Sequence, residues 1–209
     1  MQKMRLSVLL TAAAISVCAQ AQIAYSSFLP GYDYDENTGY YITGADAPPK
    51  FVQTLAMGFE SAASGQIDTI SVAVGFLGLG AGRDVRMTLF ADDGTGQNFG
   101  SQLGFWEFFD TADDPTGEVF HIQNNDAVSL NAGTFYWLYM EPLQTNGFHI
   151  WLYGDQNILC PALISHDGGN SFSYSKVNTA PAMEMTVVPE PATLLALGAG
   201  LVLLLRRKP

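Results

Sequence analysis

Cysteine and basic residues are scarce in this sequence. Its two cysteines, Cys18 and Cys160, allow at most one disulfide, and none if Cys18 is removed with an N-terminal signal. Only four of the nine Lys and Arg lie in segment 22–188, against nineteen Asp and Glu, so this segment has a formal net charge of −15. Such a surface repels nucleic acid and anionic membranes, and we expect no nucleic-acid partner. The fold must therefore depend on its hydrophobic core.

Sustained helical periodicity is missing between the two ends of the chain. Short β-prone runs alternate there with Gly, Asp, Asn and Pro, a pattern typical of an all-β sandwich. In 66–76, Ile70, Val72 and Val74 share one face, and 83–90 turns its own apolar residues inward. We expect one domain, 22–187, folded as a single antiparallel, jelly-roll-like β-sandwich. Its predicted strands are 51–60, 66–76, 83–90, 100–109, 118–122, 134–140, 147–153, 162–165, 171–174 and 182–188.

Residues 1–21 have the order of a secretory signal peptide. Lys3 and Arg5 precede an apolar stretch that we expect to be helical, and Ala19 and Ala21 form a small-x-small cleavage signal. About 12 apolar residues are too few to cross a ~30 Å hydrocarbon core. Cys18 leaves a lipoprotein as an alternative, although a small residue does not precede it. Cleavage is expected after Ala21.

Residues 188–209 contain three consecutive features. Pro189, Glu190 and Pro191 form an extended strap, because each proline fixes φ and disfavours helix at the residue before it. The apolar run 192–205 is expected to be a hydrophobic helix, whose fourteen residues span only about 21 Å. The end is basic, with Arg206, Arg207 and Lys208, which the positive-inside rule keeps cytoplasmic. The tail therefore predicts a membrane anchor of marginal length with the domain outside and close to it.

This order of a Pro-Glu-Pro motif, a Leu-rich run and an Arg-rich end resembles the PEP-CTERM sorting signal of Gram-negative bacteria. The resemblance implies that an exosortase, a membrane cysteine transpeptidase, recognises Pro189, Glu190 and Pro191 and removes the tail. It further implies passage through the export machinery, transient anchoring in the membrane, and a place at the cell surface or in an extracellular matrix with exopolysaccharide. The chain would be the substrate of the sorting enzyme, so these three residues are recognised and not catalytic.

The middle segment also resembles a known type of domain. The resemblance covers roughly 25–188 and depends on short turn and strand signatures in the order Pro30-Gly31-Tyr32-Asp33, Met57-Gly58-Phe59, Leu89-Phe90-Ala91-Asp92-Asp93-Gly94, Ala132-Gly133-Thr134-Phe135-Tyr136-Trp137-Leu138 and Asp167-Gly168-Gly169-Asn170-Ser171-Phe172. This order resembles the choice-of-anchor R type of bacterial surface domain, a β-rich module found with alternative anchors. The resemblance implies an exported module and supplies no activity.

Asp33, Asp35 and Asn37 resemble the start of a calcium loop, in which oxygen ligands at alternate positions surround the cation. The EF-hand pattern fails, because Thr38 and Gly44 stand where it requires Gly and Glu. Aspartate also favours turns, since its side chain accepts hydrogen bonds from nearby backbone N–H groups. We therefore expect no cofactor, and a structural calcium ion stays open as the alternative.

Candidate nucleophiles are few. In Ser165-His166-Asp167, neighbours along an extended chain point to opposite faces, whereas a catalytic triad needs side chains from separated segments. Cys160 is expected to be a small buried hydrophobe. We predict no catalytic residue, and a hydrolase is the second alternative for function.

A carbohydrate-binding module is the first alternative. Alternation along 147–153 places Trp151 and Tyr153 on one face with His149, and leaves Phe148, Ile150 and Leu152 for the core. If exposed, the two aromatic rings would form a platform for sugar stacking. Trp137, with Phe135 and Tyr139, is expected to pack instead. Taken together, the sequence predicts an exported structural or adhesive surface protein that is not an enzyme.

Overall fold

The computed structural model describes residues 20–48, 51–78, 82–109, 114–123, 127–155 and 157–189. Within these ranges the chain is all-β, with two antiparallel sheets and no helix. The helices expected in the signal peptide and in 192–205 lie outside the described residues. The same ranges contain no helix that could cross a membrane.

The larger sheet has seven strands. Its path runs β1-β13-β4-β10-β2, and two short strands also pair with β4. The twelve-residue β4 thus pairs with four of the other six strands. The bounds are β1 Gln22–Ser26, β2 Asp35–Thr43, β4 Gly65–Phe76, β7 Glu118–Gln123, β8 Ser129–Leu130, β10 Phe148–Tyr153 and β13 Met183–Val188.

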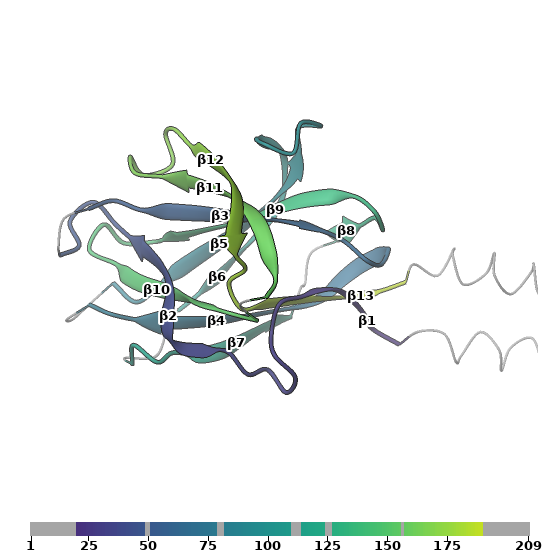
Figure 1. The fold of residues 1–209 in the computed structure, drawn as a ribbon, viewed down its shortest axis with the longest axis horizontal. Coiled ribbons are helices and arrows are strands. Elements are labelled where there is room, and N and C mark those ends of the chain that lie inside the picture. The colour runs from purple at the N-terminus through teal and green to yellow at the C-terminus, as the bar shows by residue number, and fades with distance from the viewer. Residues whose placement is uncertain are drawn as a thin grey trace, which may run out of the picture.

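The smaller sheet has six strands in the order β12-β11-β3-β9-β5-β6. Figure 1 shows the two sheets as two layers, with β3, β11 and β12 above and β2, β4 and β7 below. The bounds are β3 Thr54–Glu60, β5 Val85–Asp92, β6 Phe99–Phe108, β9 Phe135–Pro142, β11 Leu159–Ser165 and β12 Ser173–Thr179.

A single apolar core joins the two sheets. Ile70, Val72 and Val74 of β4 and Met87 and Leu89 of β5 are fully buried in it, as their alternation predicts. Burying side chains of this size contributes roughly 1.5–3 kcal/mol each. Because no disulfide is present among the described residues, this core is the main source of stability.

Ten of the strands overlap predicted ones, and most boundaries agree closely, as for 66–76 against Gly65–Phe76 and 118–122 against Glu118–Gln123. The exception is β12, Ser173–Thr179, which shares only two residues with the predicted strand 171–174. β1, β2 and β8 were not predicted. The segment of β2, DENTGYYIT, begins with turn-forming residues and lacks alternation, so only its pairing with β10 makes it a strand. At Gly39 the two strands are so close that a Cβ would lie 2.4 Å from the Trp151 carbonyl oxygen.

Both sheets are also partly covered on their outer faces. On the seven-stranded sheet, Ala73, Ile150, Leu152 and Ala182 are buried beneath Phe28 and Tyr34 of the β1–β2 connection, among others. On the six-stranded sheet, a second outer cluster is formed by Ala56, Trp137, Tyr139 and Leu163 with the rings of Phe90, Phe99, Phe135 and Phe172. The predicted packing of Trp137 with Phe135 and Tyr139 is confirmed, and the strands of both sheets therefore bury side chains in two directions.

We expect a buried histidine to destabilise the domain in acid. His149 is fully buried beside Phe76, and burial lowers its pKa from 6.5 to about 4. The unfolded chain takes up this proton below pH 6.5 and the folded chain does not, so stability is lost as the pH falls towards 4. The residue should account for about 3 kcal/mol of that loss.

Urea unfolding near neutral pH and near pH 4 would measure it. His149→Gln should reduce the difference between the two free energies of unfolding, whereas His166→Gln, at an exposed histidine, should leave it unchanged. An unaltered pH dependence in His149→Gln would contradict the prediction.

Candidate functional site

Both ends of the domain leave it at one place, which we call the exit end. It consists of Gln22, Gly65, Gln66, Val187, Val188 and Pro189. The first strand, β1, and the last, β13, are antiparallel neighbours, and Gln22 lies opposite Val187. In Figure 1 the purple start and the yellow-green end of the chain leave the domain on the same side.

β13 is held between two strands at the exit end. Met183, Met185 and Val187 point into the core, where they are fully buried. Along the edge of β13 that faces away from β1, Val187 pairs with Ile67 of β4, and Val188 pairs with Gln66 of β4. The strand ends at Val188, because the next residue, Pro189, has no N–H to donate to a ladder.

Pro189 is itself buried, and Gly65 makes this possible. A Cβ at Gly65 would lie 2.4 Å from the Val188 carbonyl oxygen and 3.1 Å from the Pro189 Cα. Only a residue without a side chain allows this approach. The predicted last strand is confirmed as far as Val188, and the predicted closeness of the domain to its membrane anchor stays a prediction, because the anchor lies outside the described residues.

The other predicted residues of the two ends are only partly described. Ala21 is exposed directly before β1, so the expected cleavage after it would create a new N-terminus opposite Val187. Ala19, Glu190 and Pro191 lie outside the described residues, as do the basic residues Arg206, Arg207 and Lys208. Their predicted roles stay predictions.

The predicted sugar platform is wrong for Trp151. This side chain is fully buried in the core between the sheets, and its Nε1 donates to the Ala182 carbonyl at 3.3 Å. Tyr153 is half-buried, with its ring against Tyr40 at 4.8 Å between centroids. The face was misassigned because the outer side of β10 is covered too, so Ile150 and Leu152 are buried there.

The predicted calcium residues are occupied by local hydrogen bonds. One Asp35 oxygen accepts from the Asn37 backbone N–H at 2.9 Å, the other accepts from the Thr38 hydroxyl, and Asp33 accepts from the N–H of Tyr34. These are the bonds by which aspartate stabilises turns. In the part of the chain that the structure describes, no three His, Cys, Asp or Glu side chains gather as a metal site. A calcium ion stays an untested alternative.

Ser165 and Asp167 stabilise a turn. The Ser165 hydroxyl donates to Asp167 at 2.8 Å and accepts the Gly169 N–H, and Ser171 donates to Asp167 twice. The bonds from Ser171, and then that from Ser165, lower the pKa of Asp167 to about 2. The exposed His166 lies within 3.3 Å of the Val52 carbonyl, not against Ser165. The three residues therefore do not converge as a triad.

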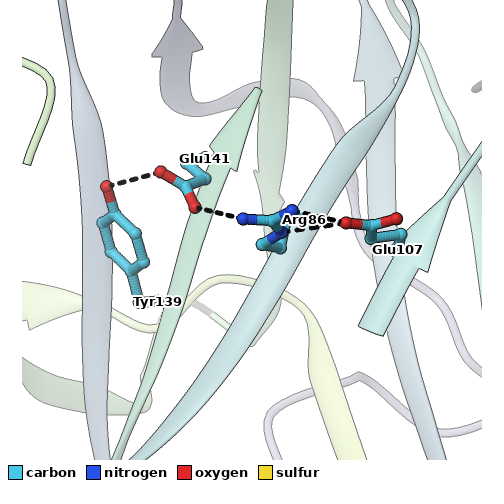
Figure 2. A network of polar contacts seen from close by, with 4 residues as sticks. All are labelled: Arg86, Glu107, Tyr139 and Glu141. Carbon is cyan, nitrogen blue, oxygen red and sulfur yellow. Dashed lines mark hydrogen bonds and ion pairs between the residues drawn. The ribbon is translucent and has the colours of Figure 1, made fainter. Parts of the chain in front are cut away.

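A polar row on the outer face of the six-stranded sheet was missed by sequence reasoning (Figure 2). Arg86 of β5 lies opposite both Glu107 of β6 and Glu141 of β9. Its guanidinium donates to Glu107 at 2.6 and 3.0 Å and lies 3.8 Å from Glu141, whose other oxygen accepts from the Tyr139 hydroxyl at 3.3 Å. Arg86 also covers the ring of the half-exposed Phe105, at 5.4 Å from its centre.

A cavity of about 330 Å³ adjoins this row. Glu141 and Asp167 bring carboxylates to it, and Thr43, Gln144 and Thr145 add hydroxyl and amide groups. Burial raises the pKa of the Tyr139 hydroxyl, and the nearby Glu141 adds to the shift, so the phenol stays a proton donor. Strand spacing alone could not have revealed the site, because its residues come from four separate segments.

A second polar row crosses the outer face of the seven-stranded sheet. Ser71 lies opposite both Glu184 and His121, and its hydroxyl is 2.9 Å from the His121 Nδ1. Tyr32, which has a φ of 63°, donates to Glu184 at 2.6 Å and places its ring edge against His121. The carboxylate is thus next to Tyr32 rather than the histidine, and Ser71 is buried, which is not the order of a nucleophilic triad.

The comparisons with known proteins concern the tail. Residues 187–208 match the family model described as the PEP-CTERM protein-sorting motif. No curated protein matches the chain. The motif indicates processing by an exosortase and export to a cell-surface or extracellular destination. The match begins at Val187, so it includes the last two residues of β13. The resemblance of the middle segment to a choice-of-anchor R domain stays a prediction.

We expect the Cys160 thiol to be unreactive in the folded domain. It is 5% exposed in the main core, and desolvation raises its pKa to about 12. Since the thiolate is the reactive form, native Cys160 should react with a thiol reagent at pH 8 about a thousandfold more slowly than in urea. A Cys18→Ala background makes it the only thiol for this measurement. Rapid labelling of the native protein would show that the site opens.

Proposed function

We propose that the chain is an exported structural or adhesive protein of the cell surface or extracellular matrix, sorted by an exosortase and associated with exopolysaccharide. Residues 1–21 act as a signal peptide, 22–187 form the β-sandwich that remains outside, and 188–209 are a sorting tail. Before processing, the tail holds the protein in the membrane through its hydrophobic helix. The observation that carries the proposal is the match of 187–208 to the PEP-CTERM motif, which starts inside the last strand of an all-β domain.

The properties of the domain support this assignment. The −15 formal charge of 22–188 keeps an exported domain soluble. A structural role needs no catalytic centre, and the nucleophile candidates have other roles, Cys160 in the core and Ser165 in a turn. A hydrolase is therefore not proposed.

Carbohydrate binding is the second candidate function, at a different place from the one predicted. The observation that favours it is the polar row of Arg86, Glu107 and Glu141 beside an exposed aromatic ring and a cavity of about 330 Å³. Sugars need both kinds of group, since their hydroxyls take hydrogen bonds and their C–H faces pack on aromatic rings. Neutral or cationic polymers suit so acidic a surface better than anionic ones.

The sorting proposal predicts the fate of the tail. Replacing Pro189, Glu190 and Pro191 together by Ala should leave the tail uncut and the protein in the membrane fraction, while the native chain reaches the surface without it. Mass spectrometry of surface material checks this through the peptides of 206–209. Intact tail peptides in native surface protein would contradict the proposal.

The binding proposal predicts that Glu141 matters for polysaccharide retention. Glu141→Ala should reduce binding of the surface-released protein to exopolysaccharide, or to a glycan array, by about tenfold, since it removes a charge-assisted acceptor worth roughly 1.5–3 kcal/mol. Glu36→Ala, at an exposed acid of β2, is the matched control and should bind as the native protein does. Equal binding by native protein and Glu141→Ala would remove this surface as the site.

A further inference from the structure

The strand order places the last strand of the domain inside its sheet. In the order β1-β13-β4, β13 has hydrogen-bonding partners on both sides. At the exit end, Val187 lies between Gln22 and Ile67, and Val188 pairs with Gln66. The chain therefore has a neighbouring strand on both sides up to Val187, and Val188, directly before Pro189, is paired with β4 alone.

Pro189, the first residue of Pro-Glu-Pro, belongs to the folded domain as well. Pro189 is buried, and the Cα of Pro189 lies so close to Gly65 that a Cβ there would be 3.1 Å away. Covalent geometry allows at most about 3.6 Å per residue, so Pro191 can be no more than about 7 Å from Pro189. The Pro-Glu-Pro motif therefore follows the domain directly, with no linker between them.

A transpeptidase has to enclose the backbone that it cuts. Peptides are commonly taken up in extended form through their main-chain N–H and C=O groups. Val187 stands in the ladder with β1 on one side and β4 on the other, so no free strand edge is available to an incoming cleft at this residue. A cleft cannot surround such a strand without displacing one neighbour, and Pro189 would have to leave its buried position.

We propose that the folded domain restrains its own sorting motif, and that an exosortase takes up Pro189 only after the end of β13 has detached from β1 and β4. The inference rests on the proposed function, in which an exosortase processes the tail. Only the fraction of molecules with a detached end is competent, and this fraction scales the processing rate. Gly65 is a positioning residue in this scheme, because it lets Val188 and Pro189 lie down on β4.

An insertion between Val188 and Pro189 tests the restraint. About eight Gly and Ser residues add roughly 25 Å of reach, so the motif can enter the enzyme while β13 stays in place. In pulse-labelled cells that contain an exosortase, the half-life of the uncut form should fall by about tenfold. The same insertion between Gly94 and Thr95, at an open hairpin tip, is the matched control and should leave the half-life unchanged.

A pair of glycine substitutions distinguishes a specific role of Gly65 in holding Val188 and Pro189 from a general loss of stability of the domain. At both Gly65 and Gly39 a Cβ would lie 2.4 Å from a backbone carbonyl oxygen, and both glycines belong to the seven-stranded sheet. Gly65→Ala and Gly39→Ala should each lower the thermal unfolding midpoint, but only Gly65→Ala should speed tail removal. Equal acceleration by both would overturn the specific role of the exit end.

The outcomes distinguish the two proposals. If the native chain is cut and the Val188–Pro189 insertion is cut at the same rate or more slowly, the restraint is refuted and sorting by an exosortase stands. If no variant loses its tail, the native chain included, the proposed function itself is wrong and the restraint falls with it.

Discussion

The pairing of β13 between β1 and β4 is the constraint on which the rest of the structure depends. It joins the first and last strands of the domain, and it is reinforced by Ser27, whose hydroxyl accepts the Met183 N–H at 3.0 Å while its own N–H donates to the Met183 carbonyl. Three methionine and valine side chains of β13 then close the core from this side. Such long-range pairing makes closure of the sheet a late step in folding, because bringing distant segments together costs loop-closure entropy before their contacts form. The larger sheet is complete only when β13, the last strand in the described chain, has paired with β1 and β4.

Two-sided burial is the second principle of the fold. With one cysteine in the domain and few basic residues available for ion pairs, stability comes from apolar contacts in three places: the main core and an outer cluster on each sheet. The outer cluster of Trp137 and Tyr139 also supports the polar row of Arg86 and Glu141, because Tyr139 belongs to both. The polar row proposed for polysaccharide contact is therefore carried by strands of the sheet, whereas most of the adjoining cavity is lined by connections between strands.

The same architecture links stability and sorting. Pro189 marks the boundary between domain and tail, and it is buried on the domain side of that boundary. In the proposed restraint, pairing of the last strand opposes fraying, whereas uptake of Pro189 by the sorting enzyme requires the end of this strand to open. The residues of the exit end therefore affect both the stability of the last strand and the access of the sorting enzyme to Pro189.

The sequence by itself determined the strands that alternate clearly, such as β4 and β5 with Ile70, Val72 and Met87 inward, and the nature of the tail, because period-two patterning and the Pro-Glu-Pro order are local properties. It could not determine which face of β10 is covered, since Trp151 and Ile150 are both apolar and alternation does not say what packs on either side. Only the tertiary structure decided that question, through the outer cluster in which Phe28 and Tyr34 of the β1–β2 connection pack against buried residues that include Ile150. It likewise decided that DENTGYYIT is a strand, that Arg86 meets Glu107 and Glu141, and that Pro189 is buried. Each of these depends on segments far apart in the chain, and local patterning carries no information about such contacts.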